Sequence, residues 1–262
     1  MASDQRDRVE ERQNSESASQ GTNAHGQQEF IVIIRGYNCE KTIGKCLDSL
    51  RAQTHPYWNA MVVLDAPTDN SANVTRPYVN DKHDKRIRML INDERKGLCF
   101  NMWFSIKFAA SILRPTDETI FAFLDADDWL APEALQKHAK VYRKYPDTLV
   151  THGSYIKVSK SRRTKISKPY PKHGKVRKLP WKGSHLKACK WAVLKHIEPE
   201  WFQHKGQWLD AASDLALMFG VIDIAGLEHT RHVHSLVYYW RDHMTKRKAE
   251  AQMRCERIQR AK

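Results

Sequence analysis

Three carboxylates follow a short apolar run near the middle of the chain: Asp125, Asp127 and Asp128 come directly after residues 121–124, Phe-Ala-Phe-Leu. Such a run predicts a buried strand at the centre of a sheet. Like charges at this spacing repel one another unless one is protonated or a cation lies among them. Oxygen ligands without histidine or cysteine suit Mg²⁺ or Mn²⁺. The stretch therefore predicts a divalent-cation site that bridges nucleotide phosphates; the alternative is the acidic start of a helix at Pro132.

The segment Phe-Leu-Asp-Ala-Asp-Asp-Trp (residues 123–129) resembles the metal-binding DxD segment of family 2 glycosyltransferases, which have the GT-A fold. Asp125 and Asp127 match its two acids. The resemblance implies that Asp127 binds the Mn²⁺ or Mg²⁺ ion and that Asp125 lies beside it, on the metal or on the donor ribose. Further segments follow in the family's order, so the resemblance extends from about Phe30 to His243.

A first predicted strand, Ile31–Ile34, and an amphipathic helix over 41–53 resemble the family's opening strand and helix, and Tyr37 between them is an implied donor contact. Where the family has Pro-Thr, this chain has Arg35 and Gly36. The glycine permits close approach of the backbone to a ligand. For the arginine two positions remain open, at the donor phosphates or at the surface.

A second predicted strand, 61–64, ends at Asp65. In the family the matching acid hydrogen-bonds the base of the nucleotide, whereas a turn cap is the alternative role. Leu64 replaces the family's other acid at this turn. After a third strand over 86–91, the helix over 99–113 lacks the arginine that relatives place on the diphosphate. Arg95 or Lys96, in the loop before that helix, would supply the missing charge to a UDP-sugar donor.

Residues 209–220, Leu-Asp-Ala-Ala-Ser-Asp-Leu-Ala-Leu-Met-Phe-Gly, predict another helix. It resembles the family's Glu-Asp-x-x-Leu helix, whose aspartate is the general base, so Asp214 is the implied base and Ser213 replaces the glutamate. Asp210 lies one turn earlier on nearly the same face and is the second candidate, with a cap as its alternative role.

A late strand over 233–240 leads into Arg241 and His243, which match the family's closing segment. The resemblance implies that Arg241 contacts the departing diphosphate and that His243 contacts the metal or the diphosphate.

The net charge of +14 is concentrated in one part of the chain. Residues 148–197 contain 14 lysines and arginines and no acid, whereas the rest has 30 basic and 30 acidic residues. Within this part, residues 157–182 show no helical periodicity, which predicts a long basic loop. Its sequence also includes the aromatic residue Tyr170. A bound polyanion would relieve the repulsion between these charges, through contacts with phosphates and stacking of bases on the aromatic rings. The alternative is a loop whose charges are simply solvated. The candidate nucleic-acid contacts are Arg162, Arg163, Lys165, Lys168, Lys172 and Trp181.

Alternation of strands and helices predicts an α/β fold, a GT-A, Rossmann-like and mostly parallel central sheet flanked by helices, with a smaller acceptor-side region. A basic helix is predicted over 184–196. We expect a disordered tail over 1–28, a glycosyltransferase domain over 29–245, and a basic helix or tail over 246–262. The domain divides into a nucleotide-sugar half, 29–147, and an acceptor half, 148–245. Five cysteines without a CxxC pair, no apolar run of ~20 residues and no signal peptide predict a cytoplasmic protein, in the host cytoplasm if the protein is viral.

These features together predict a metal-dependent, inverting glycosyltransferase that moves a sugar from a UDP-sugar to an acceptor hydroxyl. The concentrated basic charge favours a hydroxymethylated base in DNA as acceptor, as in phage DNA-modifying enzymes, which would flip the base to reach it. A second hypothesis is synthesis of a lipid-linked, capsular or lipopolysaccharide glycan, with the basic loop on anionic lipid at the membrane surface. A third is a catalytically dead transferase fold that binds nucleic acid. The oligomeric state is left open.

Overall fold

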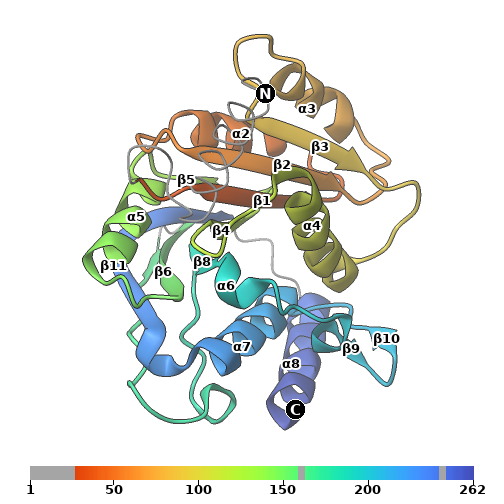
Figure 1. The fold of residues 1–262 in the computed structure, drawn as a ribbon. Coiled ribbons are helices and arrows are strands. Elements are labelled where there is room, and N and C mark those ends of the chain that lie inside the picture. The colour runs from red at the N-terminus through yellow and green to blue at the C-terminus, as the bar shows by residue number, and fades with distance from the viewer. Residues whose placement is uncertain (1–26, 159–162, 242–245) are drawn as a thin grey trace, which may run out of the picture.

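The computed structural model describes residues 27–158, 163–241 and 246–262. A nine-stranded sheet runs through the molecule in the order β3-β2-β1-β4-β8-β6-β11-β5, with β7 paired to β6 (Figure 1). Helices cover both of its faces. The predicted α/β fold is confirmed, with a sheet that is parallel in its first half and mixed in its second.

The first half of the sheet contains four parallel strands, and β1 lies between β2 and β4. Its elements are β1 (Phe30–Gly36), α2 (Ile43–Arg51), β2 (Trp58–Leu64), α3 (Ser71–Val79), β3 (Ile87–Ile91), α4 (Leu98–Leu113) and β4 (Ile120–Asp125). All were predicted within a few residues except α3. Parallel strands bring their carboxyl ends to one edge of the sheet, where ligands bind in open α/β folds.

The second half joins strands of both directions. The chain here forms β5 (Trp129–Leu130), α5 (Ala134–Lys144), β6 (Val150–Val158), β7 (Arg163–Lys165), β8 (Lys187–Lys190), α6 (Trp191–Leu194), α7 (Ser213–Ala225), β11 (Thr230–Arg241) and α8 (Lys246–Ala261). The hairpin of β9 (Gln203–His204) and β10 (Gln207–Trp208) is a separate two-stranded sheet. The predicted helix over 184–196 is wrong in its middle, where Lys187–Lys190 form β8, antiparallel to β4 and β6. Only Trp191–Leu194 of that range are helical, as α6. The basic loop over 157–182 likewise contains β7 and a 3-10 turn, Val176–Lys178.

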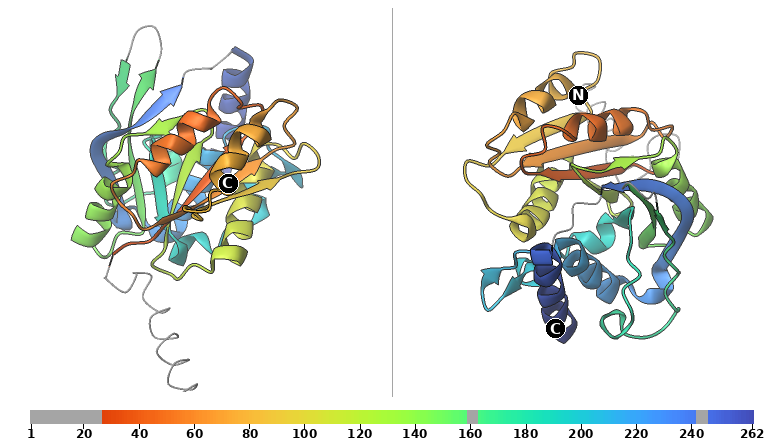
Figure 2. Two further views of the ribbon diagram at one scale, coloured as in Figure 1. Left: turned by 90° about the horizontal axis from the view of Figure 1, so that it is seen from above. Right: turned by 180° about the vertical axis from the view of Figure 1, so that it is seen from behind.

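Each face of the sheet has its own hydrophobic core, because side chains alternate along the strands. Ile31 and Ile33 of β1 face α4 and α7, while Phe30, Val32 and Ile34 face α2 and α5. Two views show α2 and α3 on one side and α4, α7 and α8 on the other (Figures 1 and 2). In the described ranges no helix is long and apolar enough to cross a bilayer, and all five cysteines are buried free thiols.

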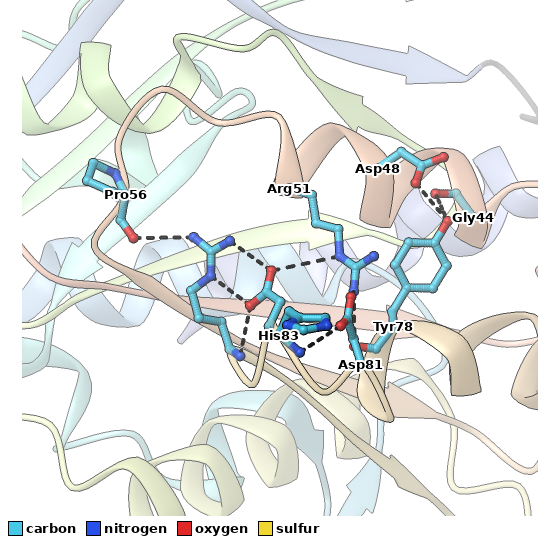
Figure 3. A network of polar contacts seen from close by, with 9 residues as sticks. Gly44, Asp48, Arg51, Pro56, Tyr78, Asp81 and His83 are labelled. Carbon is cyan, nitrogen blue, oxygen red and sulfur yellow. Dashed lines mark hydrogen bonds and ion pairs between the residues drawn. The ribbon is translucent and has the colours of Figure 1, made fainter.

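Arg51 fastens α2 to the loop between α3 and β3 (Figure 3), and Arg86 holds an acid within that loop. Arg51 of α2 lies 2.9 Å from Asp81 and 3.8 Å from Asp84, and Arg86 lies 2.8 Å from Asp84. Hydrogen bonding to Arg86 lowers the pKa of Asp84 to about 2. This network fixes the C-terminal end of α2. The N-terminal end of α2 lies beside the acidic turn after β4.

Candidate active site

The carboxyl ends of β1, β2 and β4 meet at one edge of the sheet. Arg35 pairs in register with Asp125, and Gly36 with Leu64. A Cβ at Gly36 would lie 2.7 Å from Cys39 Sγ and 2.8 Å from the Cβ of Ala126, so only glycine fits here. This close packing places the acidic turn after β4 directly against the end of β1.

Asp65, at the end of β2, is held in a cage of hydrogen-bond donors. Its carboxylate accepts bonds from Asn92 Nδ2 (3.0 Å), Arg95 Nε (3.0 Å) and the backbone N–H groups of Lys96 (2.8 Å) and Gly97 (3.0 Å). Burial opposes ionisation, but these bonds outweigh it and lower the pKa of Asp65. Each carboxylate oxygen already accepts two bonds, so a ligand that bonds to Asp65 has to displace one donor.

Arg95 is an exposed member of that cage, with half of its side chain accessible to solvent. Its guanidinium stacks on the ring of Tyr37, 3.4 Å from the ring centroid. The structure thus brings together Tyr37, Asp65, Arg95 and the backbone of Lys96, all predicted as donor contacts.

The three clustered carboxylates occupy three different environments. Asp125 forms an ion pair with Arg35. Asp128 is buried and accepts hydrogen bonds from Tyr238 Oη (2.6 Å) and Arg241 N (2.7 Å). Burial, with the neighbouring acids adding to it, raises the pKa of Asp128 to about 8.

The third carboxylate, Asp127, borders an open pocket of about 220 Å³ together with Arg241. The alternative role as a helix start is wrong for all three acids, because α5 begins later and Glu133 occupies its N-cap position.

A divalent cation fits this turn by the chemistry of its ligands. Asp127 and Asp125 offer hard carboxylate oxygens, and Mg²⁺ or Mn²⁺ commonly takes one or two carboxylates and completes its shell with phosphate and water. Within the described residues no three histidine, cysteine or acidic side chains form a complete cage. His243, the remaining predicted ligand, lies outside the described residues.

Arg35 is the site residue whose role was not predicted from the sequence. It is buried rather than exposed, with Nη2 2.9 Å from Asp125 Oδ1 and Nη1 donating to Ser213 Oγ at 3.1 Å. The position at the surface is therefore wrong, whereas contact with the donor phosphates stays a prediction. Arg35 and Ser213 are two of the departures from the family's pattern, and here their side chains touch one another.

Asp214 lies in the first turn of α7, next to Ser213. Its carboxylate is 3.0 Å from Nζ of Lys187, a nearly buried residue of β8 that also donates to His185 Nδ1 at 2.9 Å. Burial by itself would raise the pKa of Asp214, but Lys187, with His185 and Arg35, lowers it to about 2. The side chain is 32% exposed, so an ionised carboxylate is accessible at this point.

Asp210 does not share the helical face of Asp214, because α7 begins only at Ser213. The predicted spacing of one helical turn is therefore wrong. Asp210 instead forms an exposed ion pair of 2.6 Å with Arg254 of α8 and accepts a bond from Cys255 Sγ.

The aromatic residues of the basic segment belong to the core. Tyr170 is buried and its hydroxyl accepts bonds from the N–H groups of Lys182 (2.9 Å) and Gly183 (3.0 Å). Trp181 packs edge-to-face on Phe219 of α7. These contacts count against stacking on bases, although that prediction stays untested.

The basic candidates are placed unevenly. Lys168 and Lys172 are exposed, and Arg163 and Lys165 belong to β7. Arg162 lies outside the described residues.

Known proteins match this chain in sequence and in fold. The model for glycosyl transferase family 2 matches residues 31–201. One sequence relative is the UDP-Glc:alpha-D-GlcNAc-diphosphoundecaprenol beta-1,3-glucosyltransferase WfgD of Escherichia coli, 34% identical over 101 residues, which cover 38% of this chain and 36% of WfgD. The chain thus spans about a third of that relative.

Two solved structures share the fold. TarS 1–349 of S. aureus in complex with UDP has a TM-score of 0.61 at 20% identity, covering 88% of this chain and 65% of that one. The mannosyltransferase PcManGT from Pyrobaculum calidifontis, in complex with GDP-Man and Mn²⁺, has a TM-score of 0.54 at 17% identity, covering 89% and 61%.

Proposed function

Because the chain belongs to glycosyl transferase family 2, we propose that it is a metal-dependent, inverting glycosyltransferase that uses a nucleotide-sugar donor. One observation carries the proposal: three carboxylates of different state converge at one edge of the sheet. They are the caged Asp65, the turn carboxylate Asp127, and Asp214, which is coupled to that turn through Ser213, Arg35 and Asp125.

The nucleotide base and ribose are assigned to the end of β2. Tyr37 and Arg95 provide a flat cation–aromatic surface, and Asp65 provides an ionised acceptor for the N–H of a base. Arg95 would leave Asp65 as the base arrives, since it is the most exposed of the four donors. We propose UDP as the nucleotide, a choice supported by the fold shared with TarS bound to UDP.

The diphosphate is assigned to the acidic turn. Asp127, with Asp125 beside it, would hold Mn²⁺ or Mg²⁺, which as a Lewis acid would stabilise the negative charge of the departing diphosphate by several kcal/mol. Arg241, whose backbone N–H donates to Asp128 of the same turn, would add positive charge. Arg35 keeps Asp125 paired and oriented throughout.

Asp214 is proposed as the general base. The acceptor oxygen forms a bond to the anomeric carbon, the bond from that carbon to the diphosphate oxygen breaks, and the hydroxyl proton passes to Asp214. With a pKa of about 2 the carboxylate is ionised at neutral pH but weakly basic. It therefore accepts the proton late, when the attacking oxygen has become acidic. Lys187 holds the carboxylate in place.

For the acceptor we propose a glycan, lipid-linked or part of a surface polymer. The acceptor in the name of WfgD, a sugar on diphosphoundecaprenol, supports this choice, as does the packing of Tyr170 and Trp181 in the core. A hydroxymethylated base in DNA stays a prediction that rests on the basic charge of residues 148–197. A dead transferase fold is disfavoured because Asp125, Asp127 and Asp214 are all retained.

The test is a transfer assay with purified protein, UDP-glucose, UDP-galactose and UDP-N-acetylglucosamine, each with Mn²⁺, Mg²⁺ or EDTA. Acceptors are a lipid diphosphate carrying one sugar, an unphosphorylated glycoside and hydroxymethylated duplex DNA. We expect metal-dependent UDP release and a product of inverted anomeric configuration on a glycan. Absence of UDP release with every donor, or transfer to DNA alone, would contradict the proposal.

A further inference from the structure

The pocket beside Asp127 is lined by charged side chains that are mainly positive. It has a volume of about 220 Å³ and is lined by Lys41 and Lys45 near the start of α2, Arg241 at the end of β11, and Trp129 of β5. Three cationic side chains thus share this space with the single carboxylate of Asp127.

From this arrangement we propose that the pocket binds a phosphate group of the acceptor, so that the acceptor is a phosphate-bearing glycan or polyol. The inference rests on the proposed function and narrows its substrate class. Two sources share the same chemistry, a phosphodiester of a surface polymer and the diphosphate of a lipid-linked sugar.

Lys45 is positioned for an anion without being neutralised by an acid. Its Nζ lies 3.3 Å from the centroid of the Trp129 ring. Trp129 in turn stacks on Tyr239, with ring centroids 5.6 Å apart, because β5 and β11 pair at these residues. A cation on an aromatic face keeps N–H donors available. Across the described ranges neither Lys41 nor Lys45 forms an ion pair with an acid.

The same contacts favour a phosphate over a nucleobase. The ring of Trp129 is already engaged by Lys45 and Tyr239, which leaves little aromatic surface on which a base could stack. The volume is below the ~300–1,000 Å³ of sites for larger organic ligands. A single phosphate with part of its polyol or sugar matches both the size and the charge.

The pocket borders the reacting centre but not the nucleotide-base site. Asp127 lines it, whereas none of the residues that surround Asp65 does so. Its walls come from the start of α2, the turn into β5, and the ends of β6 and β11. A phosphate bound here would lie next to the proposed metal and hold the acceptor beside the departing diphosphate.

The experiment uses the full chain and the double variant Lys41→Gln, Lys45→Gln. Lys140→Gln serves as the matched control, an exposed lysine on a helix away from the pocket. Binding is measured in UDP and Mn²⁺ for a poly(glycerol phosphate) oligomer, a short-chain lipid diphosphate carrying N-acetylglucosamine, an uncharged methyl glycoside and a short DNA duplex. UDP binding and UDP-sugar hydrolysis are measured separately.

We expect the double variant to weaken at least one phosphorylated probe by about tenfold or more, the loss of a charge-assisted hydrogen bond. The uncharged glycoside, UDP affinity and hydrolysis stay unchanged, and Lys140→Gln has no effect. The probe that responds, polymer or lipid diphosphate, identifies the phosphate source.

Four results would overturn the inference: unchanged affinity for both phosphorylated probes, no binding of either by the wild type, a parallel loss of UDP affinity, or a duplex that binds more tightly than both probes and loses affinity in the double variant. Failure of the proposed function is distinct from these, because the wild type would then neither bind UDP nor hydrolyse a UDP-sugar.

Discussion

The guanidinium of Arg35 lies 2.9 Å from Asp125 and donates a second bond to Ser213, so it joins the acidic turn after β4 to the start of α7. Arg35 and Ser213 are 178 residues apart in the sequence, and this hydrogen bond fixes their relative positions. Arg35 therefore links Asp125, which is proposed to lie beside the metal, to the helix that carries Asp214.

Breaking this ion pair should weaken both stability and turnover. Arg35→Met leaves Asp125 without its partner. Because Asp125 is 38% exposed, solvent screens the loss, and we expect a coupling energy of about 1 kcal/mol with Asp125→Asn in a double-mutant cycle of chemical unfolding. Additive single effects would show that the contact contributes nothing. Ser213→Ala, which removes only the second bond, is the milder control.

Lys187 should control the pH dependence of turnover through Asp214. Asp214 works as the carboxylate, and with its pKa at about 2 the wild type should show no acid limb above about pH 4. In Lys187→Met the main group that offsets burial is lost, so the pKa of Asp214 should rise, and kcat/KM should fall as the pH decreases toward the new pKa.

The pH profile of kcat/KM checks this prediction. Lys195→Met, which removes the partner of the exposed Asp117, should leave the profile unchanged. A profile of Lys187→Met that lacks an acid limb, like that of the wild type, would show that Lys187 does not control the pKa of the base.

Asp214→Asn should lower turnover by ~100-fold or more, the range that general-base catalysis supplies. Donor affinity should change little, because the carboxylate faces Lys187 rather than Asp65. Asp210→Asn removes only an exposed contact with Arg254 and serves as the control. If Asp210→Asn had the larger effect on single-turnover rates, the assignment of the base would be wrong.

Acid should weaken the network at Asp84. The pKa of this carboxyl is depressed in the folded state, so its contribution is present above the unfolded pKa of about 4 and is lost as the pH falls toward about 2. Arg86→Ala should lower the free energy of unfolding by about 1 kcal/mol at pH 7, because solvent screens the partly exposed Arg86, and Arg51 and the backbone N–H of residue 86 still contact Asp84. The difference from wild type should shrink in urea titrations between pH 4 and pH 2.

Arg76→Ala, which removes a bond to Asn73 and no ion pair, should show no such pH dependence. A difference in Arg86→Ala that stays constant down to pH 2 would assign its effect to the stacking of Arg86 on Trp58 instead.

The acids of the site were predictable because each follows a local pattern. Asp65 and Asp125 come directly after apolar runs that form β2 and β4, and Asp214 opens a helix that is apolar on nearly every side. Because β2 and β4 are parallel strands of one sheet, their carboxyl ends, and with them Asp65 and Asp125, lie at the same edge. By contrast, α3 escaped prediction because its buried residues are polar, Ser71 and Thr75, so the helix carries no apolar stripe.

The partners of those acids were not predictable, because they depend on contacts between distant residues. Lys187 and Lys190 were predicted to lie in a basic helix, yet both are buried in β8, where Asp214 and Glu118 supply counter-charges from outside that strand. The role of Arg35 required its contact with Ser213. No local propensity encodes either arrangement.

The central claim is that Asp127 holds a divalent cation on which the donor diphosphate binds. Its most direct test is calorimetric titration of UDP into wild type and Asp127→Asn, with Mn²⁺ and with EDTA, after circular dichroism has shown that both proteins are folded. The account predicts UDP binding that requires Mn²⁺ in the wild type and a loss of that metal-dependent binding in the variant. Equal UDP affinity in wild type and variant, or wild-type affinity that EDTA does not change, would contradict it.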